Sequence, residues 1–259
     1  MLSQSLVVAH KEIVESFRDN RSVFSLLMYS LMGPLAVGLV SLSPAIRGAA
    51  QSPLAGLMSV FTLVSAFTSG MNVAMDTIAG ERERRSLLPL LLNPVHRRNI
   101  IIGKWLTVSL FSILGLAVTL LGFSVVFVTS GMHLQVPWPR FLLAIALGMF
   151  PLPILAASIL LLLSTGCRSL KEAQTHLSMV VFLPMGVGMF LVFFPAARRA
   201  WLNFLPLVGQ QLHLQSLADG RAVPLVQSFV LGCLTLTLAT LVMLVSSNRL
   251  HRDEIIYGN

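Results

Sequence analysis

The stretch GERERRSLLPLLLNPVHRRNIIIGKW, residues Gly80–Trp105, is a charged interruption in a chain that is otherwise mostly apolar. A short apolar run separates two charged groups within it. The eight charged residues of the stretch are Glu81, Arg82, Glu83, Arg84, Arg85, Arg97, Arg98 and Lys104. Because the segments on both sides are apolar, this stretch is the surface best suited to contact with a soluble partner.

The composition places the chain among membrane proteins. Of its 259 residues, 55% are hydrophobic and 11% are charged, whereas a soluble domain carries about 25% charged residues. The net charge of +8 raises the possibility of a nucleic-acid partner, but a soluble basic domain would not lack polar surface, so we expect none. The two cysteines, Cys167 and Cys233, show no metal or disulfide spacing and are interpreted as packing residues.

Apolar runs of about 20 residues predict an all-α integral membrane protein in the lipid bilayer, with residues 1–259 forming a single transmembrane domain. The expected transmembrane helices cover residues 23–42, 54–78, 100–128, 141–163, 177–194 and 223–245. Residues 195–222 are too polar to span the membrane. We expect them to form short re-entrant or interfacial helices at the outer surface.

The spacing of apolar and charged residues in 2–20 predicts an amphipathic helix ahead of the first span. Charged residues, Glu12 among them, lie off its apolar stripe. The stripe consists of Leu6, Val7, Ile13, Val14 and Phe17. A helix of this kind lies in the plane of the membrane interface. The alternative is a plain polar leader into the first span.

The distribution of Lys and Arg predicts the orientation in the membrane. Six spans put both termini on one side, and 13 of the 18 basic residues fall on that side. Basic residues are in excess in cytoplasmic loops. We therefore expect both termini and residues 80–104 to be cytoplasmic, in a bacterial-type inner membrane.

The sequence offers little chemistry for catalysis. Almost no ionisable residue lies inside the expected spans, and those that do so are usually functional. Asn72 and Asp76 lie near the cytoplasmic end of the second span, where Asp76 either pairs with a nearby arginine or lines a polar path. There is no Gly-x-Ser-x-Gly, His-Glu-x-x-His or Walker-type loop, and the six histidines are scattered. We predict no catalytic, cofactor-binding or metal-binding residues.

A short helix is expected inside the charged stretch. Ser86 can cap it, and the helix should stop before Pro94, because the residue before a proline disfavours helical backbone. Leu87, Leu90 and Leu91 then share one face. A helix of about two turns is unstable alone in water, so a partner that buries the leucines is expected. The alternative is an arginine-rich loop at the lipid headgroups.

This stretch resembles the signature of type-2 ABC exporter permeases, most closely the Nat-type sodium-exporter permeases. The residues that match are Gly80, Glu81, Glu83, Arg84, Leu87, Leu90, Leu91, Pro94, Arg97, Gly103 and Lys104. The chain departs from the pattern at Arg85, Ser86, Leu88 and His96, where the family favours Gly, Thr, Glu and Ser. Residues 43–53 also leave no room for the large outer domain that Nat-type permeases usually carry between the first two spans.

The resemblance implies a permease subunit of an ABC exporter that moves sodium or another small substrate. Two such subunits, identical or homologous, would dock on two ATP-binding subunits, which hold the ATP and Mg²⁺. The residues expected to couple to the ATPase, within 80–98, are Glu81, Glu83, Arg84, Ser86, Leu87, Leu90, Leu91, Pro94 and Arg97. Candidate pathway residues are Asn72, Asp76 and Pro184.

Two functions of other classes compete with this interpretation. The first is an ATP-independent membrane scaffold or assembly factor that recruits a soluble protein through residues 80–98. The second is an intramembrane hydrolase, for which the sequence shows no catalytic pattern.

Overall fold

The computed structural model describes residues 2–42, 52–84, 97–129, 138–221 and 223–249, and the statements below concern those residues. They form helices and connecting turns, with no strand among them. Six helical segments are long and apolar enough to cross a membrane: Asn20–Ser41, Leu54–Glu83, Arg98–Thr129, Leu142–Gly166, Leu170–Phe193 and Leu225–Arg249. The prediction of an all-α membrane protein with six spans is confirmed.

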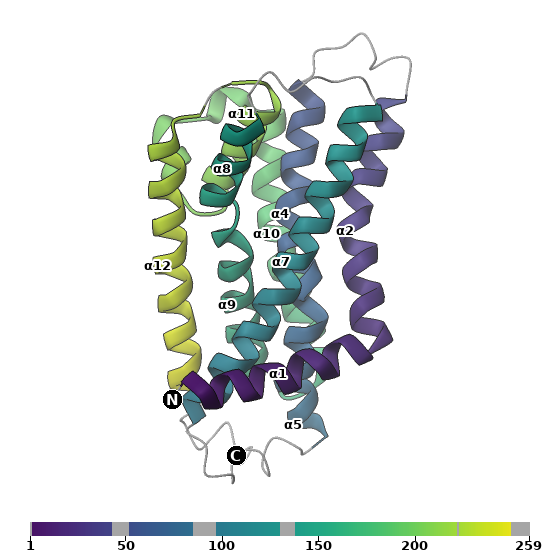
Figure 1. The fold of residues 1–259 in the computed structure, drawn as a ribbon, viewed down its shortest axis with the longest axis vertical. Helices are drawn as coiled ribbons and strands as arrows, with labels where there is room; N and C mark the ends of the chain where they lie inside the picture. The colour runs from purple at the N-terminus through teal and green to yellow at the C-terminus, as the bar shows by residue number, and fades with distance from the viewer. Residues whose placement is uncertain (1, 43–51, 85–96, 130–137, 222, 250–259) are drawn as a thin grey trace.

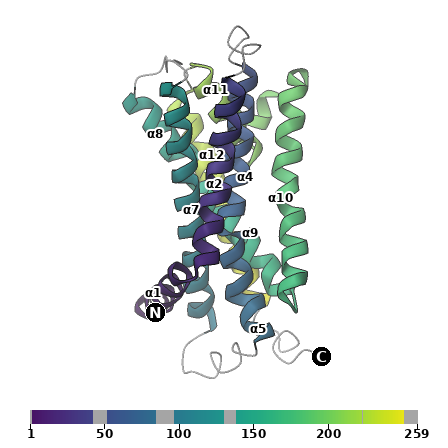
Figure 2. The ribbon, with the colours of Figure 1, turned by 90° about the vertical axis from the view of Figure 1, so that its right-hand side faces the viewer.

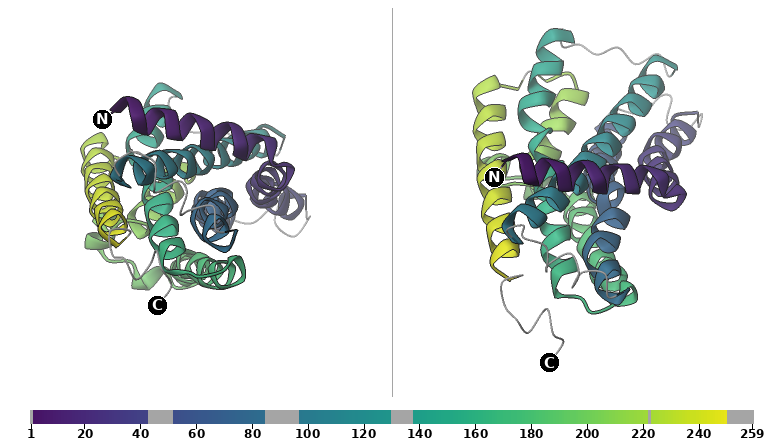
Figure 3. Two further views of the ribbon diagram at one scale, coloured as in Figure 1. Left: turned by 90° about the horizontal axis from the view of Figure 1, so that it is seen from below. Right: turned by 60° about the horizontal axis from the view of Figure 1, so that its bottom comes forward.

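The long helices stand side by side in a bundle (Figure 1). They are α2 (Asn20–Ser41), α4 (Ser52–Ala74), α7 (Arg97–Thr129), α9 (Pro151–Gly166), α10 (Leu170–Phe193) and α12 (Leu225–Arg249). Helix α1 (Leu2–Arg18) crosses one end of the bundle, which we call the α1 end (Figure 3). At the opposite end, the α11 end, lie α8 (Trp138–Gly148) and α11 (Val208–Ala218).

Two spans form the centre of the bundle. The span built on α4 is 83% buried and the one containing α9 is 61% buried, whereas each of the other four is at most 33% buried. Phe67 of α4 and Phe111 of α7 belong to the main apolar core. Helix α10 stands at the edge of the bundle (Figure 2) and is 22% buried. The exposed apolar faces of the outer helices are those that face lipid in a membrane.

Small and hydroxyl residues bring α2, α4 and α7 close together. The hydroxyls of Ser30 and Ser69 lie 3.2 Å apart, and Thr119 Oγ1 donates to the Ser30 carbonyl at 3.0 Å. Thr119 Oγ1 also lies 2.6 Å from Ser65 Oγ. A Cβ atom added at Gly115 of α7 would lie 2.0 Å from Ser69 Oγ. Such close approach allows helix association by packing and interhelical hydrogen bonds in lipid.

Two membrane-spanning helices extend beyond the apolar part of their sequence into polar residues. After α4 the chain continues through a π-helical turn, η1 (Met75–Gly80), into the short helix α5 (Glu81–Glu83), so the first charged residues of the 80–105 stretch prolong the second span. Helix α10 begins at Leu170, several residues before the predicted start at 177. The reason is the N-cap: Ser169 Oγ accepts a hydrogen bond from the Glu172 amide at 3.3 Å.

The segment expected at the outer surface forms short helices. They are the 3₁₀ turns η2 (Pro195–Ala197) and η3 (Ala200–Phe204), followed by α11. Helix α11 carries buried polar side chains that bond to the spans: Gln210 Nε2 donates to Thr235 Oγ1 at 2.6 Å, and Gln211 Nε2 donates to the Gly188 carbonyl at 2.8 Å. These hydrogen bonds offset part of the cost of burying two amides.

Helix α1 is amphipathic, as predicted, but its buried face is not its apolar stripe. Leu6, Val7 and Val14 are exposed, as expected for a helix whose apolar face enters a lipid interface. The side that packs on the bundle carries Ala9 and Glu12. Glu12 lies off the apolar stripe, as predicted, and it faces the bundle because it pairs with the buried lysine described below.

The corner between α1 and α2 is held by an N-cap. Asp19 accepts hydrogen bonds from the amides of Arg21 and Ser22 and from the Ser22 hydroxyl. Partial burial alone would raise the pKa of Asp19, but these hydrogen bonds outweigh it and hold the pKa below its ordinary value. The stabilisation is therefore full above the ordinary pKa of 3.8 and is lost as the pH falls through the lower folded-state pKa.

We expect Asp19→Ala to lower the free energy of unfolding by about 1 kcal/mol at neutral pH, because two amides at the start of α2 lose their acceptor. The difference from the wild type should shrink in acid, below the folded-state pKa. Thermal unfolding in detergent at several pH values measures both effects. The control Asp19→Asn keeps a capping oxygen at every pH, and equal stability of Asp19→Ala and wild type at neutral pH would contradict the assignment.

Candidate functional site

The charged stretch is anchored by a lysine that is almost completely buried. The side chain of Lys104, near the start of α7, is 1% exposed. Its Nζ atom lies 3.0 Å from a carboxylate oxygen of Glu12 in α1 and 2.8 Å from one of Glu81 in α5. We call these three residues the Lys104 cluster. It ties together α1, the charged extension of the second span, and α7.

Glycine and hydroxyl positions let α1 pack on α7 closely enough to form this cluster. A Cβ atom at Gly103 would lie 2.7 Å from a methyl carbon of Val8. One turn later, Thr107 Oγ1 donates to the Ala9 carbonyl at 3.4 Å. At the other end of the contact, Asn99 Nδ2 donates to Gln4 Oε1 at 2.9 Å. Seen from the α1 end, α1 lies along α7 and reaches α2 (Figure 3).

Burial makes the Lys104 cluster a rigid connection. Removing ions from water costs several kcal/mol for each ion, and only close pairing offsets this cost. Separating Lys104 from its carboxylates would leave a lysine charge that is 1% exposed without its closest partners. The cluster therefore ties α5 to both α7 and α1.

A second ion pair lies in the same end of the bundle but near the surface. Arg84 donates to Asp76 Oδ1 at 2.6 Å, and both side chains are about half exposed. Of the arginines considered as partners for Asp76, the structure selects Arg84. Gly80 makes this contact possible, because a Cβ atom there would lie 2.7 Å from Asp76 Oδ1. The π-helical turn η1 holds Asp76 and Gly80 in this arrangement; such turns are frequent at functional sites.

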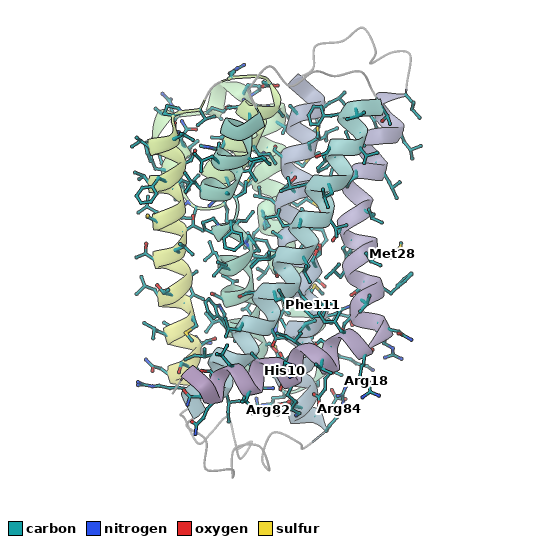
Figure 4. All side chains as sticks on the ribbon, viewed as in Figure 1. His10, Arg18, Met28, Arg82, Arg84 and Phe111 are labelled. Atoms are coloured by element: carbon teal, nitrogen blue, oxygen red, sulfur yellow. The ribbon has the colours of Figure 1, made fainter. Side chains whose placement is uncertain are left out.

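The remaining charges of α5 bind the link between α9 and α10. Arg82 Nη1 donates to the Cys167 carbonyl at 3.1 Å, and Glu83 Oε2 accepts from the Leu170 amide at 2.7 Å. Figure 4 shows Arg82 and Arg84 beside α5 at the α1 end. Four successive residues, 81–84, therefore contact three different parts of the bundle.

A polar cavity of about 730 Å³ opens beside the Lys104 cluster. Asn72 and Asp76, two of the candidate pathway residues, line it together with residues of α1 and α2 such as Glu15 and Arg21. The third, Pro184, lines a separate apolar cavity of about 220 Å³ next to Gln211 of α11. The structure thus places the candidate pathway residues in two cavities and does not bring them together.

Several predicted coupling residues lie outside the described part of the chain. These are Ser86, Leu87, Leu90, Leu91 and Pro94. Arg97 is the first residue of α7. The coupling helix itself therefore stays a prediction, whereas Glu81, Glu83 and Arg84 are placed by the contacts above.

Sequence reasoning missed Glu12 and gave Lys104 no role of its own. One signal was available: a lysine at the start of a long apolar run needs a counter-charge when it is buried. That signal points to Lys104 but not to its partners. Glu12 precedes it by 92 positions, and the three acidic residues among residues 2–20, Glu12, Glu15 and Asp19, were equally plausible.

Comparison with known proteins gives the family. Residues 6–245 match the model of the ABC-2 family transporter proteins. The chain is similar to the ABC transporter permease protein NatB of Bacillus subtilis, at 31% identity over 174 residues, which are 64% of this chain and 45% of that protein. It is also similar to the probable ABC transporter permease protein NosY of Pseudomonas aeruginosa, at 32% identity over 152 residues, 55% of this chain and 50% of that protein.

The aligned regions thus cover about half the length of each of these relatives. The family model, in contrast, spans nearly all of the described helices, from α1 to α12. The family resemblance of the charged stretch is thereby confirmed. The chain belongs to the ABC-2 family of transporter proteins.

Proposed function

We propose that the chain is the transmembrane permease subunit of an ATP-binding cassette exporter, driven by ATP hydrolysed on a separate subunit. The observation that carries the proposal is the Lys104 cluster. It connects the signature stretch to both the interfacial helix and the third span. A permease whose helices are moved by a separate ATPase subunit requires such a connection. The sequence itself has no Walker-type loop, so the energy must come from a partner.

In this proposal the α1 end is cytoplasmic, as the excess of basic residues favours. The partner ATPase, which holds ATP and Mg²⁺, receives the apolar face of Leu87, Leu90 and Leu91 in a groove. Closure of the ATPase would push residues 80–98. The buried pairs of Lys104 would then move α1 and α7 together, while Arg82 and Glu83 would move the α9–α10 link.

The substrate would be sodium or another small solute, and a second copy or a homologue would complete the pathway. The polar cavity lined by Asn72 and Asp76 is suited to a hydrated substrate at the α1 end. The apolar cavity at Pro184 lies toward the α11 end. A pathway between them needs a rearrangement of the central helix α4, which supplies residues to both.

The coupling can be tested with the chain purified from its native membrane together with its ATPase. We expect the combined substitution Leu87→Glu, Leu90→Glu and Leu91→Glu to abolish co-purification, or to lower ATP hydrolysis to the rate of the ATPase alone. Three charges in place of the leucines cannot be buried without partners. Co-purification and ATP hydrolysis in reconstituted vesicles are the measurements.

A matched control places the same charges on the other side of the membrane: Ala45→Glu, Ala49→Glu and Ala50→Glu should leave ATP hydrolysis unchanged. Unaltered hydrolysis in the leucine variant would refute the coupling role of this helix. Failure of any ATP-binding protein to co-purify with the wild type would refute the permease proposal and favour a membrane scaffold.

A further inference from the structure

Three side chains able to bind a metal ion meet at the α9–α10 link. They are the thiol of Cys167, the carboxylate of Glu172 and the imidazole of His176, with ligand atoms all within 4.8 Å of one another. Cys167 Sγ and His176 Nδ1 are 3.4 Å apart. Glu172 and His176 are one helical turn apart on α10, so they share a face.

The distances fit a tetrahedral ion. Zinc bonds of about 2.3 Å to sulfur and 2.0 Å to nitrogen place these two ligands about 3.5 Å apart at the tetrahedral angle, close to the separation found. Thiolate, imidazole and carboxylate together are a ligand set that suits zinc better than magnesium or calcium, which prefer oxygen alone. A thiolate and a carboxylate also neutralise the two positive charges of the ion.

The local backbone already positions two of the ligands. Glu172 Oε2 accepts from the Arg168 amide at 2.7 Å, which fixes the carboxylate over the link. The Cys167 thiol donates to the Leu163 carbonyl at 3.3 Å. Burial raises the pKa of this thiol, and the neighbouring Glu172 carboxylate raises it further; a bound zinc ion would replace the thiol proton. His176 is exposed, which leaves a path for the ion.

Helix α5 forms hydrogen bonds with the same α9–α10 link that carries these ligands. The Arg82 guanidinium bonds to the carbonyl of Cys167 itself, and Glu83 bonds to the first amide of α10. An ion bridging Cys167 to α10 would close the link into a rigid corner beside the charged stretch. The capping role of Glu172 alone does not explain why a buried thiol faces an imidazole here.

We propose that Cys167, Glu172 and His176 form a zinc-binding site with one open coordination position at the α9–α10 corner. The site is independent of the proposed transport function, since it needs neither the ATPase nor a substrate. It also departs from the sequence-based prediction of no metal site, because spacing alone did not reveal the contact across the link.

The test uses the full chain, purified in detergent with reduced cysteines and stripped of metal. Titration with Co²⁺, which reports thiolate ligation by its absorption, should show one ion bound per chain, displaced by Zn²⁺. His176→Gln should weaken Zn²⁺ affinity by more than about tenfold, because loss of a ligand costs at least as much as loss of a supporting contact. Since His176 is exposed, this variant should keep the wild-type melting temperature.

The matched control is Cys233→Ser, which removes the exposed cysteine of α12 and should leave binding intact. In that background Zn²⁺ should slow the reaction of Cys167 with a thiol reagent, a measurement that does not depend on the folding of a Cys167 variant. Absence of a thiolate signal in the wild type, unchanged affinity of His176→Gln, or unprotected Cys167 would each overturn the proposal.

Discussion

Replacing Lys104 by methionine is expected to lower the free energy of unfolding by about 3–5 kcal/mol, the usual cost of removing one partner of a buried ion pair. Methionine fills a similar volume but removes the cation that Glu12 and Glu81 share. Helix α1 should then detach from α7. Reversible unfolding in mixed micelles measures the loss, and protease cleavage within residues 2–18 reports the detachment.

Two comparisons separate the effect of charge from that of packing. The triple variant Lys104→Met, Glu12→Gln and Glu81→Gln removes every charge of the cluster and should recover much of the stability, because no ion remains unpaired. Arg84→Met breaks an ion pair whose side chains are 61% and 48% exposed and should cost less than about 1 kcal/mol. Equal losses for Lys104→Met and Arg84→Met would show that the cluster is not buried as described.

Gly115→Ala is expected to destabilise the bundle by about 2–3 kcal/mol, the upper part of the range for overpacking a core. The added Cβ atom would lie 2.0 Å from Ser69 Oγ and 2.1 Å from Ser69 Cβ, so α4 and α7 must move apart. This separation also breaks the hydroxyl contact of Ser69 with Ser30. Thermal unfolding of the purified chain in detergent measures the result.

A glycine in open surroundings supplies the matched control. Among the described residues, no atom outside the neighbouring backbone of α10 lies within 4 Å of a Cβ at Gly186, so Gly186→Ala should be neutral or stabilise the helix by up to about 1 kcal/mol. Combining Gly115→Ala with Ser69→Gly removes both clashing atoms and should restore part of the loss. No rescue by Ser69→Gly would mean that the cost of Gly115→Ala arises elsewhere.

The membrane helices were predictable because each is specified by its own residues. About 20 apolar residues are enough to favour a spanning helix whatever its neighbours are, and the six spans follow from this. Helix ends were less predictable where polar residues extend the helix. The start of α10 depends on the Ser169 cap, and the extension of α4 to Glu83 depends on contacts with the α9–α10 link.

The charged stretch was recognised as the key segment, but its contacts were not. Sequence reasoning expected Glu81, Glu83 and Arg84 to face a partner protein. In the structure Glu81 pairs with the buried Lys104, Glu83 accepts a hydrogen bond from the Leu170 amide, and Arg84 pairs with Asp76. These contacts hold residues 81–84 at the α1 end. The coupling role predicted for Glu81, Glu83 and Arg84 and the partner contact predicted for Leu87, Leu90 and Leu91 both stay predictions.

The sequence by itself determined the class of this protein: a six-span helical membrane protein with one charged, family-specific segment between its second and third spans. Those features are local, since apolar length and a contiguous motif are read within about 25 residues. Only the tertiary structure decided which groups the charged side chains contact. Glu12 reaches Lys104, and Arg82 reaches Cys167, across 92 and 85 positions of the chain. Such pairs depend on how helices pack, and packing is set by side chains along whole helices rather than by the charged residues themselves.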